Sequence, residues 1–216
     1  GKEMRRELGL KKLSKQWISI GTVMALFIGL FTLHSSAAMA ESWNSVDGSG
    51  TNGINVDTTR NADTPRLIEF NGTLFAIWAE SIGSTDQIRV KKVENGAWVT
   101  ADNNTPLNKN PDKNAENPVL AVFNNELYAV WQEASTYTQL RAAKFNGISW
   151  DRIDGDGVNG LNYNTNSNAR APQLVVYNNS LYVVWDETLS INNAVSHQVR
   201  IKQYNGTSWI VPGVNT

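Results

Sequence analysis

The sequence predicts an all-β fold made of consecutive, similar four-stranded sheets. An apolar run ending in Trp-x-Glu recurs at a spacing of about 53 residues, as LFAIWAE at 74–80, LYAVWQE at 127–133 and LYVVWDE at 181–187. Each copy is flanked by short apolar runs separated by Asn, Gly, Asp and Ser, which is typical of antiparallel strands joined by tight turns. After residue 40 the sequence has no segment with helical periodicity.

Each repeat unit has the same internal order, which predicts where its four strands lie. A proline opens the unit, the apolar run follows, then Gln-x-Arg, and the unit closes on a tryptophan (Pro65, Pro118 and Pro172; Trp98, Trp150 and Trp209). We expect the three units to occupy about 62–100, 115–151 and 169–211 within a domain of residues 41–216. A further strand at 42–48, which contains Trp43, is expected to be the outer strand of another unit.

The second strand of each unit indicates how the sheets are arranged. Strand side chains alternate between two faces, so Leu181 and Val183 share one face while Tyr182 and Val184 share the other. Both faces are apolar and need cover, which favours the blades of a β-propeller over a sheet with one side in solvent. Known propellers have about four to eight blades. We therefore expect the chain to be part of a larger ring, either as a fragment of a longer protein or by self-association.

The first 40 residues have the pattern of a secretory signal peptide. A basic stretch from Arg5 to Lys15 precedes an apolar run at 18–33, and Ala38-Met39-Ala40 is a small-x-small cleavage signal. The alternative, an uncleaved membrane anchor, needs roughly 20 apolar residues, and this run is shorter. We expect cleavage after Ala40 and a secreted or cell-surface protein. The absence of cysteine in an exported chain fits a bacterial source.

Charge argues against a nucleic-acid partner. The chain has 19 Lys and Arg against 20 Asp and Glu, a formal net charge of −1. Removal of the basic leader makes the remainder more acidic, and that remainder has no run of basic residues for a phosphate backbone. We expect no membrane span after cleavage.

The recurring Trp, Glu and Arg are the candidate ligand-binding residues. If Glu187 pairs with Gln198 in the second hairpin, then Trp185 faces Arg200, and the other units give Trp78 with Arg89 and Trp131 with Arg141. Our main interpretation is an internal brace in which Arg bonds Glu and stacks near Trp, since a buried carboxylate needs a partner. The alternative is ligand binding by the full set: Trp78, Glu80, Arg89, Trp131, Glu133, Arg141, Trp185, Glu187 and Arg200.

Catalysis, cofactors and metals have weaker signals. Charged residues recur at equivalent positions, whereas an enzyme needs groups that differ in role, so we expect no catalytic residue and no cofactor. His197 has no equivalent in the other units. Asp154, Asp156 and Asn159 form a weak calcium candidate, because oxygen ligands at alternating positions suit that ion, but Val158 breaks the EF-hand spacing.

Two stretches resemble known propellers. Leu181-Tyr-Val-Val and Tyr204-Asn-Gly-Thr-Ser-Trp209 resemble the kelch type of repeat, although Trp-x-Glu stands where kelch repeats carry a Gly pair. The Arg, Glu and Trp set is similar in residue type to the trio with which fucose-binding propeller lectins hold sugar. Because the charged residues recur at equivalent positions, as structure or multivalent binding requires, our main functional prediction is an extracellular, non-catalytic binding or scaffold propeller that recognises glycan or protein. The alternative is the N-terminal part of a sialidase-like propeller glycoside hydrolase, with its catalytic residues elsewhere.

Overall fold

The computed structural model describes residues 46–47, 52–155, 157–192 and 194–213. The predicted signal peptide (1–40), Trp43 with most of the strand at 42–48, and Asp156 lie outside the described residues. The described part includes no helical segment with the length and apolar character that a membrane span requires.

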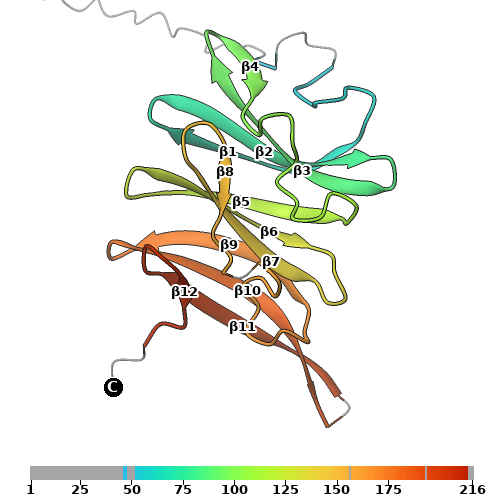
Figure 1. Ribbon diagram of the computed structural model, residues 1–216, viewed down its shortest axis with the longest axis vertical. Coiled ribbons are helices and arrows are strands. Elements are labelled where there is room, and N and C mark those ends of the chain that lie inside the picture. The colour runs from blue at the N-terminus through green and yellow to red at the C-terminus, as the bar shows by residue number, and fades with distance from the viewer. Residues whose placement is uncertain (1–45, 48–51, 156, 193, 214–216) are drawn as a thin grey trace, which may run out of the picture. The chain divides into compact units, whose positions relative to one another are not determined.

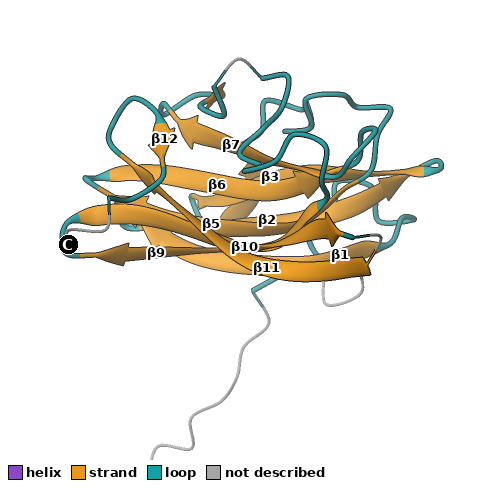
Figure 2. Cartoon of the chain, turned by 90° about the horizontal axis from the view of Figure 1, so that it is seen from below, coloured by secondary structure: helices purple, strands orange, loops and turns teal. Residues whose placement is uncertain are grey.

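Three antiparallel four-stranded sheets make up the described fold, and in each the strands lie in chain order (Figure 1). No helix occurs among the described residues, as Figure 2 shows. The strands are β1 (Ala62–Phe70), β2 (Thr73–Ile82), β3 (Thr85–Glu94) and β4 (Ala97–Thr100) in the first sheet; β5 (Ala115–Phe123), β6 (Glu126–Glu133), β7 (Gln139–Phe145) and β8 (Trp150–Arg152) in the second; and β9 (Ala169–Tyr177), β10 (Ser180–Ile191), β11 (Ala194–Tyr204) and β12 (Trp209–Ile210) in the third.

Asparagine-rich turns set the register of the first hairpin in every sheet. Asn71-Gly72, Asn124-Asn125 and Asn178-Asn179 join the first strand to the second, and both residues of each pair have positive φ. Two positive φ values define the type I′ turn, whose twist matches that of the flanking strands. Asn and Gly tolerate this conformation best, which explains why the sequence repeats them here.

The sheets pack on one another as successive blades of a partial β-propeller. Strand β5 contacts β1, β2 and β3, and β9 contacts β5, β6 and β7. One core cluster joins the first sheet to the second, with Ile77, Val90 and Trp131 among its members, and another joins the second to the third, with Val130 and Trp185. The predicted all-β propeller architecture is confirmed.

In the second sheet, the second strand is buried on both faces because a neighbouring sheet lies on each side. In β6, residues 127–131 are all buried, because the first and third sheets cover both faces. In β10, Leu181, Val183 and Trp185 are buried against the second sheet, while Tyr182 and Val184 are half-buried. The outer face of the third sheet also exposes apolar side chains: Val175 (53%), Val199 (82%) and Ile201 (46%).

A bulge interrupts the first strand of each sheet near its start. The pairing shifts between Asp63 and Arg66 in β1, between Glu116 and Val119 in β5, and opposite Val184 and Asp186 in β9. The third residue of each of these strands has a left-handed φ: Thr64 (53°), Asn117 (52°) and Ala171 (51°). The recurrent prolines follow these residues, at a point where the ladder is already broken and a missing N–H costs little.

Candidate functional site

The predicted hairpin register is correct in all three sheets. Trp78 lies opposite Arg89, Trp131 opposite Arg141, and Trp185 opposite Arg200. Glu187 pairs with Gln198, as expected from the alternation of strand side chains.

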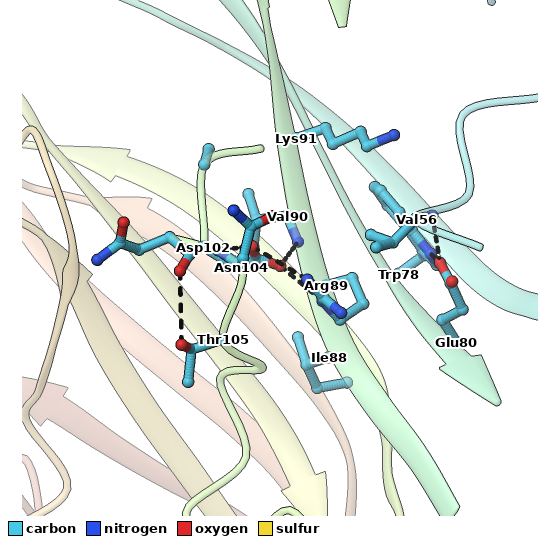
Figure 3. Close-up of polar contacts among 12 residues, drawn as sticks. Val56, Trp78, Glu80, Ile88, Arg89, Val90, Lys91, Asp102, Asn104 and Thr105 are labelled. Carbon is cyan, nitrogen blue, oxygen red and sulfur yellow. Dashed lines mark hydrogen bonds and ion pairs between the residues drawn. The ribbon is translucent and has the colours of Figure 1, made fainter. Parts of the chain in front are cut away.

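The glutamate of each Trp-x-Glu holds the loop that precedes its own sheet. Glu133 accepts hydrogen bonds from Trp131 Nε1 (3.1 Å) and from the backbone N–H groups of Lys109 (2.8 Å) and Asn110 (2.9 Å). Glu80 accepts the same three bonds, from Trp78 Nε1 and from the backbone N–H groups of Val56 and Asp57 (Figure 3 labels Glu80, Trp78 and Val56). Glu187 accepts them from Trp185 Nε1 and from the backbone N–H groups of Tyr163 and Asn164. Three donors satisfy a buried carboxylate without a cation.

The predicted pairing of this glutamate with the arginine is wrong. Arg89 pairs instead with Asp102, Nε to Oδ2 at 2.7 Å, in the loop after β4 (Figure 3). Arg141 pairs with Asp154 at 3.2 Å in the loop after β8. The guanidinium of Arg200 lies 4.2 Å from the centre of the Tyr163 ring, and its buried Nε has no hydrogen-bond partner among the described residues. The arginines face the loops because N–H donors already surround the glutamates.

The second sheet shows how little of this set is open to a ligand. Trp131, Glu133 and Arg141 are 0%, 3% and 3% exposed. The guanidinium that lies over the Trp131 ring, at 5.5 Å, belongs to Arg152 and not to the predicted Arg141. Ligand binding by the Trp, Glu and Arg set stays a prediction.

Asp154, a carboxylate of the weak calcium candidate, pairs with arginine side chains. Asp154 Oδ2 lies 3.2 Å from Arg141 Nη1 and 3.6 Å from Arg152 Nη1, so two cations already share this carboxylate. Within the described ranges, no cluster of three or more His, Cys, Asp or Glu side chains could hold a metal ion. Calcium binding by Asp154, Asp156 and Asn159 stays a prediction.

A different row of residues lies at the bulges of the first strands. Asp63, Glu116 and Arg170 each occupy the second position of β1, β5 and β9, directly before the left-handed residue. Unlike the Trp, Glu and Arg set, this row does not repeat its chemistry: two carboxylates are followed by a guanidinium. Bulges near strand ends commonly aim side chains at functional sites.

Two members of this row line one pocket. Its volume is about 310 Å³, and its lining residues are Asn114, Glu116, Gln132, Ala134, Thr138 and Arg170. Gln132 Nε2 donates to Glu116 Oε2 (3.2 Å), while Gln132 Oε1 accepts from the backbone N–H of Ala171 (3.0 Å). Gln132 therefore connects Glu116 to the bulge of the next sheet, and the second carboxylate oxygen of Glu116 makes no hydrogen bond with the described residues.

Sequence reasoning missed this row because it searched for recurrence. Asp63-x-Pro65, Glu116-x-Pro118 and Arg170-x-Pro172 share a place in the repeat but not a residue type. The signal that would have found them is a charged residue, of varying sign, two positions before each recurrent proline. His197, the other unrepeated candidate, bonds Asp186 at 2.8 Å on an exposed part of the third sheet.

Comparisons with known proteins give similarities of fold. No family model and no curated protein matches the chain. Among solved structures, the chain is similar to a family 117 glycoside hydrolase of the marine bacterium Zobellia galactanivorans (12% identity, 81% of this chain and 59% of that one, TM-score 0.49). It is also similar to an α-L-arabinofuranosidase of Lactobacillus brevis (13%, 67% and 52%, 0.44) and an endo-arabinase of Bacteroides thetaiotaomicron (11%, 70% and 61%, 0.43).

These similarities correct one of our predictions. The chain spans 52 to 61% of the length of the three solved structures named. All three are glycoside hydrolases, which contradicts the main functional prediction of a non-catalytic binding or scaffold propeller and agrees better with its alternative.

Proposed function

We propose that the chain is part of a propeller glycoside hydrolase and that the bulge row contributes to its active site. The observation that carries the proposal is the presence of two carboxylates, Asp63 and Glu116, at the same position of neighbouring first strands. Most glycoside hydrolases use such a pair, one as acid and the other as base or nucleophile.

The surroundings of the two carboxylates favour different roles. Glu116 is half-buried in the pocket, and a hydrogen bond from Gln132 orients it. We assign it the delivery of a proton to the leaving oxygen, because the pocket can hold a sugar against it. Asp63 is exposed to solvent, which suits activation of water. Active sites commonly place two carboxylates in unlike environments, so that one donates a proton and the other accepts one.

The proposal extends to the place where the enzyme acts. The leader at 1–40 supports export, and extracellular glycans are the substrates that an exported hydrolase meets. Secretion can be checked by locating the protein in fractionated cells and by sequencing the N-terminus of the mature form, which should start after Ala40.

The test measures sugar release by the protein expressed from its complete reading frame, over a panel of polysaccharides. Glu116→Gln and Asp63→Asn should each lower turnover by about 100-fold or more, since each removes a group that moves a proton. Glu126→Gln is the matched control, because Glu126 is a surface carboxylate paired with Lys144 and away from the pocket. Turnover that survives both active-site changes, or no turnover on the whole panel, would contradict the proposal.

A further inference from the structure

We propose that the pocket beside Glu116 binds an anionic sugar, with Arg170 pairing with the negatively charged group on its ring. This inference rests on the proposed function and names its class of substrate: a glycan containing uronic acid or sulfated residues.

Arg170 differs from the recurrent arginines in its burial and in its pairing. Arg89 and Arg141, the recurrent arginines of the first two sheets, are buried and held by Asp102 and Asp154. Arg170 is exposed, and its side chain makes no hydrogen bond or ion pair with the described residues. Its cross-strand neighbour Asp186 directs both carboxylate oxygens to His197, at 2.8 and 3.1 Å. Arg170 is therefore available to a ligand.

The charge of the bulge row changes sign in the third sheet. The first two sheets carry carboxylates at this position, and the third carries a cation. The guanidinium of Arg170 lies on the wall of the pocket that also holds Glu116, so an anionic group on a bound sugar would meet an opposite charge there. Arginine also presents two parallel N–H donors that match a carboxylate or sulfate edge, whereas a neutral sugar gains less from it.

The rest of the pocket suits a sugar ring. Its lining includes the amides of Asn114 and Gln132 and the hydroxyl of Thr138, which can bond sugar hydroxyls. Gln132 is held by the backbone N–H of Ala171, so part of this wall is preorganised. A volume of about 310 Å³ lies at the lower end of the range for small-molecule sites, which suits one or two sugar residues.

The experiment compares matched ligands by titration calorimetry with the protein expressed from its complete reading frame. Galacturonic and glucuronic acid are each compared with their methyl esters, and galactose 6-sulfate with galactose. We expect the anionic member of a pair to bind roughly tenfold more tightly, the usual gain for a charged hydrogen bond. A preference for the uronic acids identifies carboxylate as the recognised group, and a preference for the sulfated sugar identifies sulfate.

The variants separate Arg170 from general charge effects. Arg170→Gln should abolish the preference for the anion. Arg66→Gln is the control and should keep it, because Arg66 is also an exposed arginine near a bulge but does not line this pocket. Equal binding of charged and neutral ligands, or a preference that persists in Arg170→Gln, overturns the inference.

The outcomes also separate this inference from the proposed function. Binding of the anion through Arg170 without sugar release sustains the inference and contradicts the hydrolase. Release of neutral sugars that depends on Glu116 but not on Arg170 sustains the hydrolase and contradicts the inference.

Discussion

Arg89 and Asp102 form a buried ion pair that the second sheet repeats with Arg141 and Asp154. In both pairs the arginine on the third strand reaches an aspartate 13 residues later, after the fourth strand. The equivalent residue for Arg200 in the third sheet is Gly213. The third sheet therefore keeps the arginine but has lost its carboxylate, and Arg200 lies against Tyr163 instead.

Replacement of Gly213 should restore this ion pair. A Cβ at Gly213 would meet no described atom within 4 Å, and its backbone is outside the left-handed region. We expect Gly213→Asp to raise the free energy of unfolding by about 1 kcal/mol, the upper end for a partly exposed pair. Thermal and urea denaturation measure this change.

A double-mutant cycle shows whether Arg200 is the partner. The gain from Gly213→Asp should disappear in an Arg200→Gln background, and Gly213→Asn, which has a similar shape without the charge, should give less. An equal gain with and without Arg200 would mean that the aspartate acts through the chain backbone alone.

Glu133 is expected to be the most sensitive carboxylate in the second sheet. Glu133→Ala leaves Trp131 Nε1 and the N–H groups of Lys109 and Asn110 without their acceptor. Unsatisfied buried donors are costly, so the free energy of unfolding should fall by roughly 3 kcal/mol. Urea denaturation at neutral pH measures it.

Glu94→Ala is the matched control for Glu133. Glu94 has a side chain that is 56% exposed and lies 4.0 Å from Lys92, so its loss should change stability by less than about 1 kcal/mol. A neutral effect of Glu133→Ala, comparable to this control, would show that the carboxylate is not needed to hold the loop at Lys109.

The strands and their register could be predicted because they follow from local rules. Period-two alternation and Asn-rich turns fix which side chains share a face, and so place Trp131 opposite Arg141. The loop partners of these side chains could not be predicted in the same way. Glu133 binds the N–H groups of Lys109 and Asn110, and Arg141 binds Asp154. These partners lie in loops whose path depends on packing between sheets. The bulge row was missed because Asp63, Glu116 and Arg170 share a place before the recurrent prolines but differ in residue type, so a search for repeated residues passes over them.

The bulge at Ala171 carries strain that glycine would relieve. Ala171 has a φ of 51°, a conformation that costs a residue with a Cβ roughly 1 kcal/mol or more. Ala171→Gly should therefore raise the free energy of unfolding by about 1 kcal/mol, less the larger entropy that glycine loses on folding. Ala169→Gly is the control: Ala169 is fully buried in the same strand with ordinary φ, and its replacement should be destabilising. Loss of stability in both variants would show that Ala171 is not strained.

Lys202 should make the free energy of unfolding depend on pH in the alkaline range. It lies opposite Val183, on the face that packs against the second sheet, and burial there lowers the pKa of Lys202 although the charge of Glu187 opposes the shift. Between this lowered pKa and the ordinary value of 10.5, the unfolded chain binds more protons than the folded one. The contribution of Lys202 to stability should therefore rise as pH increases through that window.

Comparison with Lys202→Met isolates this effect from other groups. Burial also lowers the pKa of Lys91 and raises that of Tyr128, but these groups are present in both proteins and cancel in the difference. Urea denaturation from pH 7 to the alkaline limit, in about half-unit steps, should show the wild type gaining stability relative to the variant toward high pH. Because methionine keeps the length of the side chain without a charge, a constant difference would mean that Lys202 keeps its ordinary pKa and that solvent reaches its ammonium group in the folded protein.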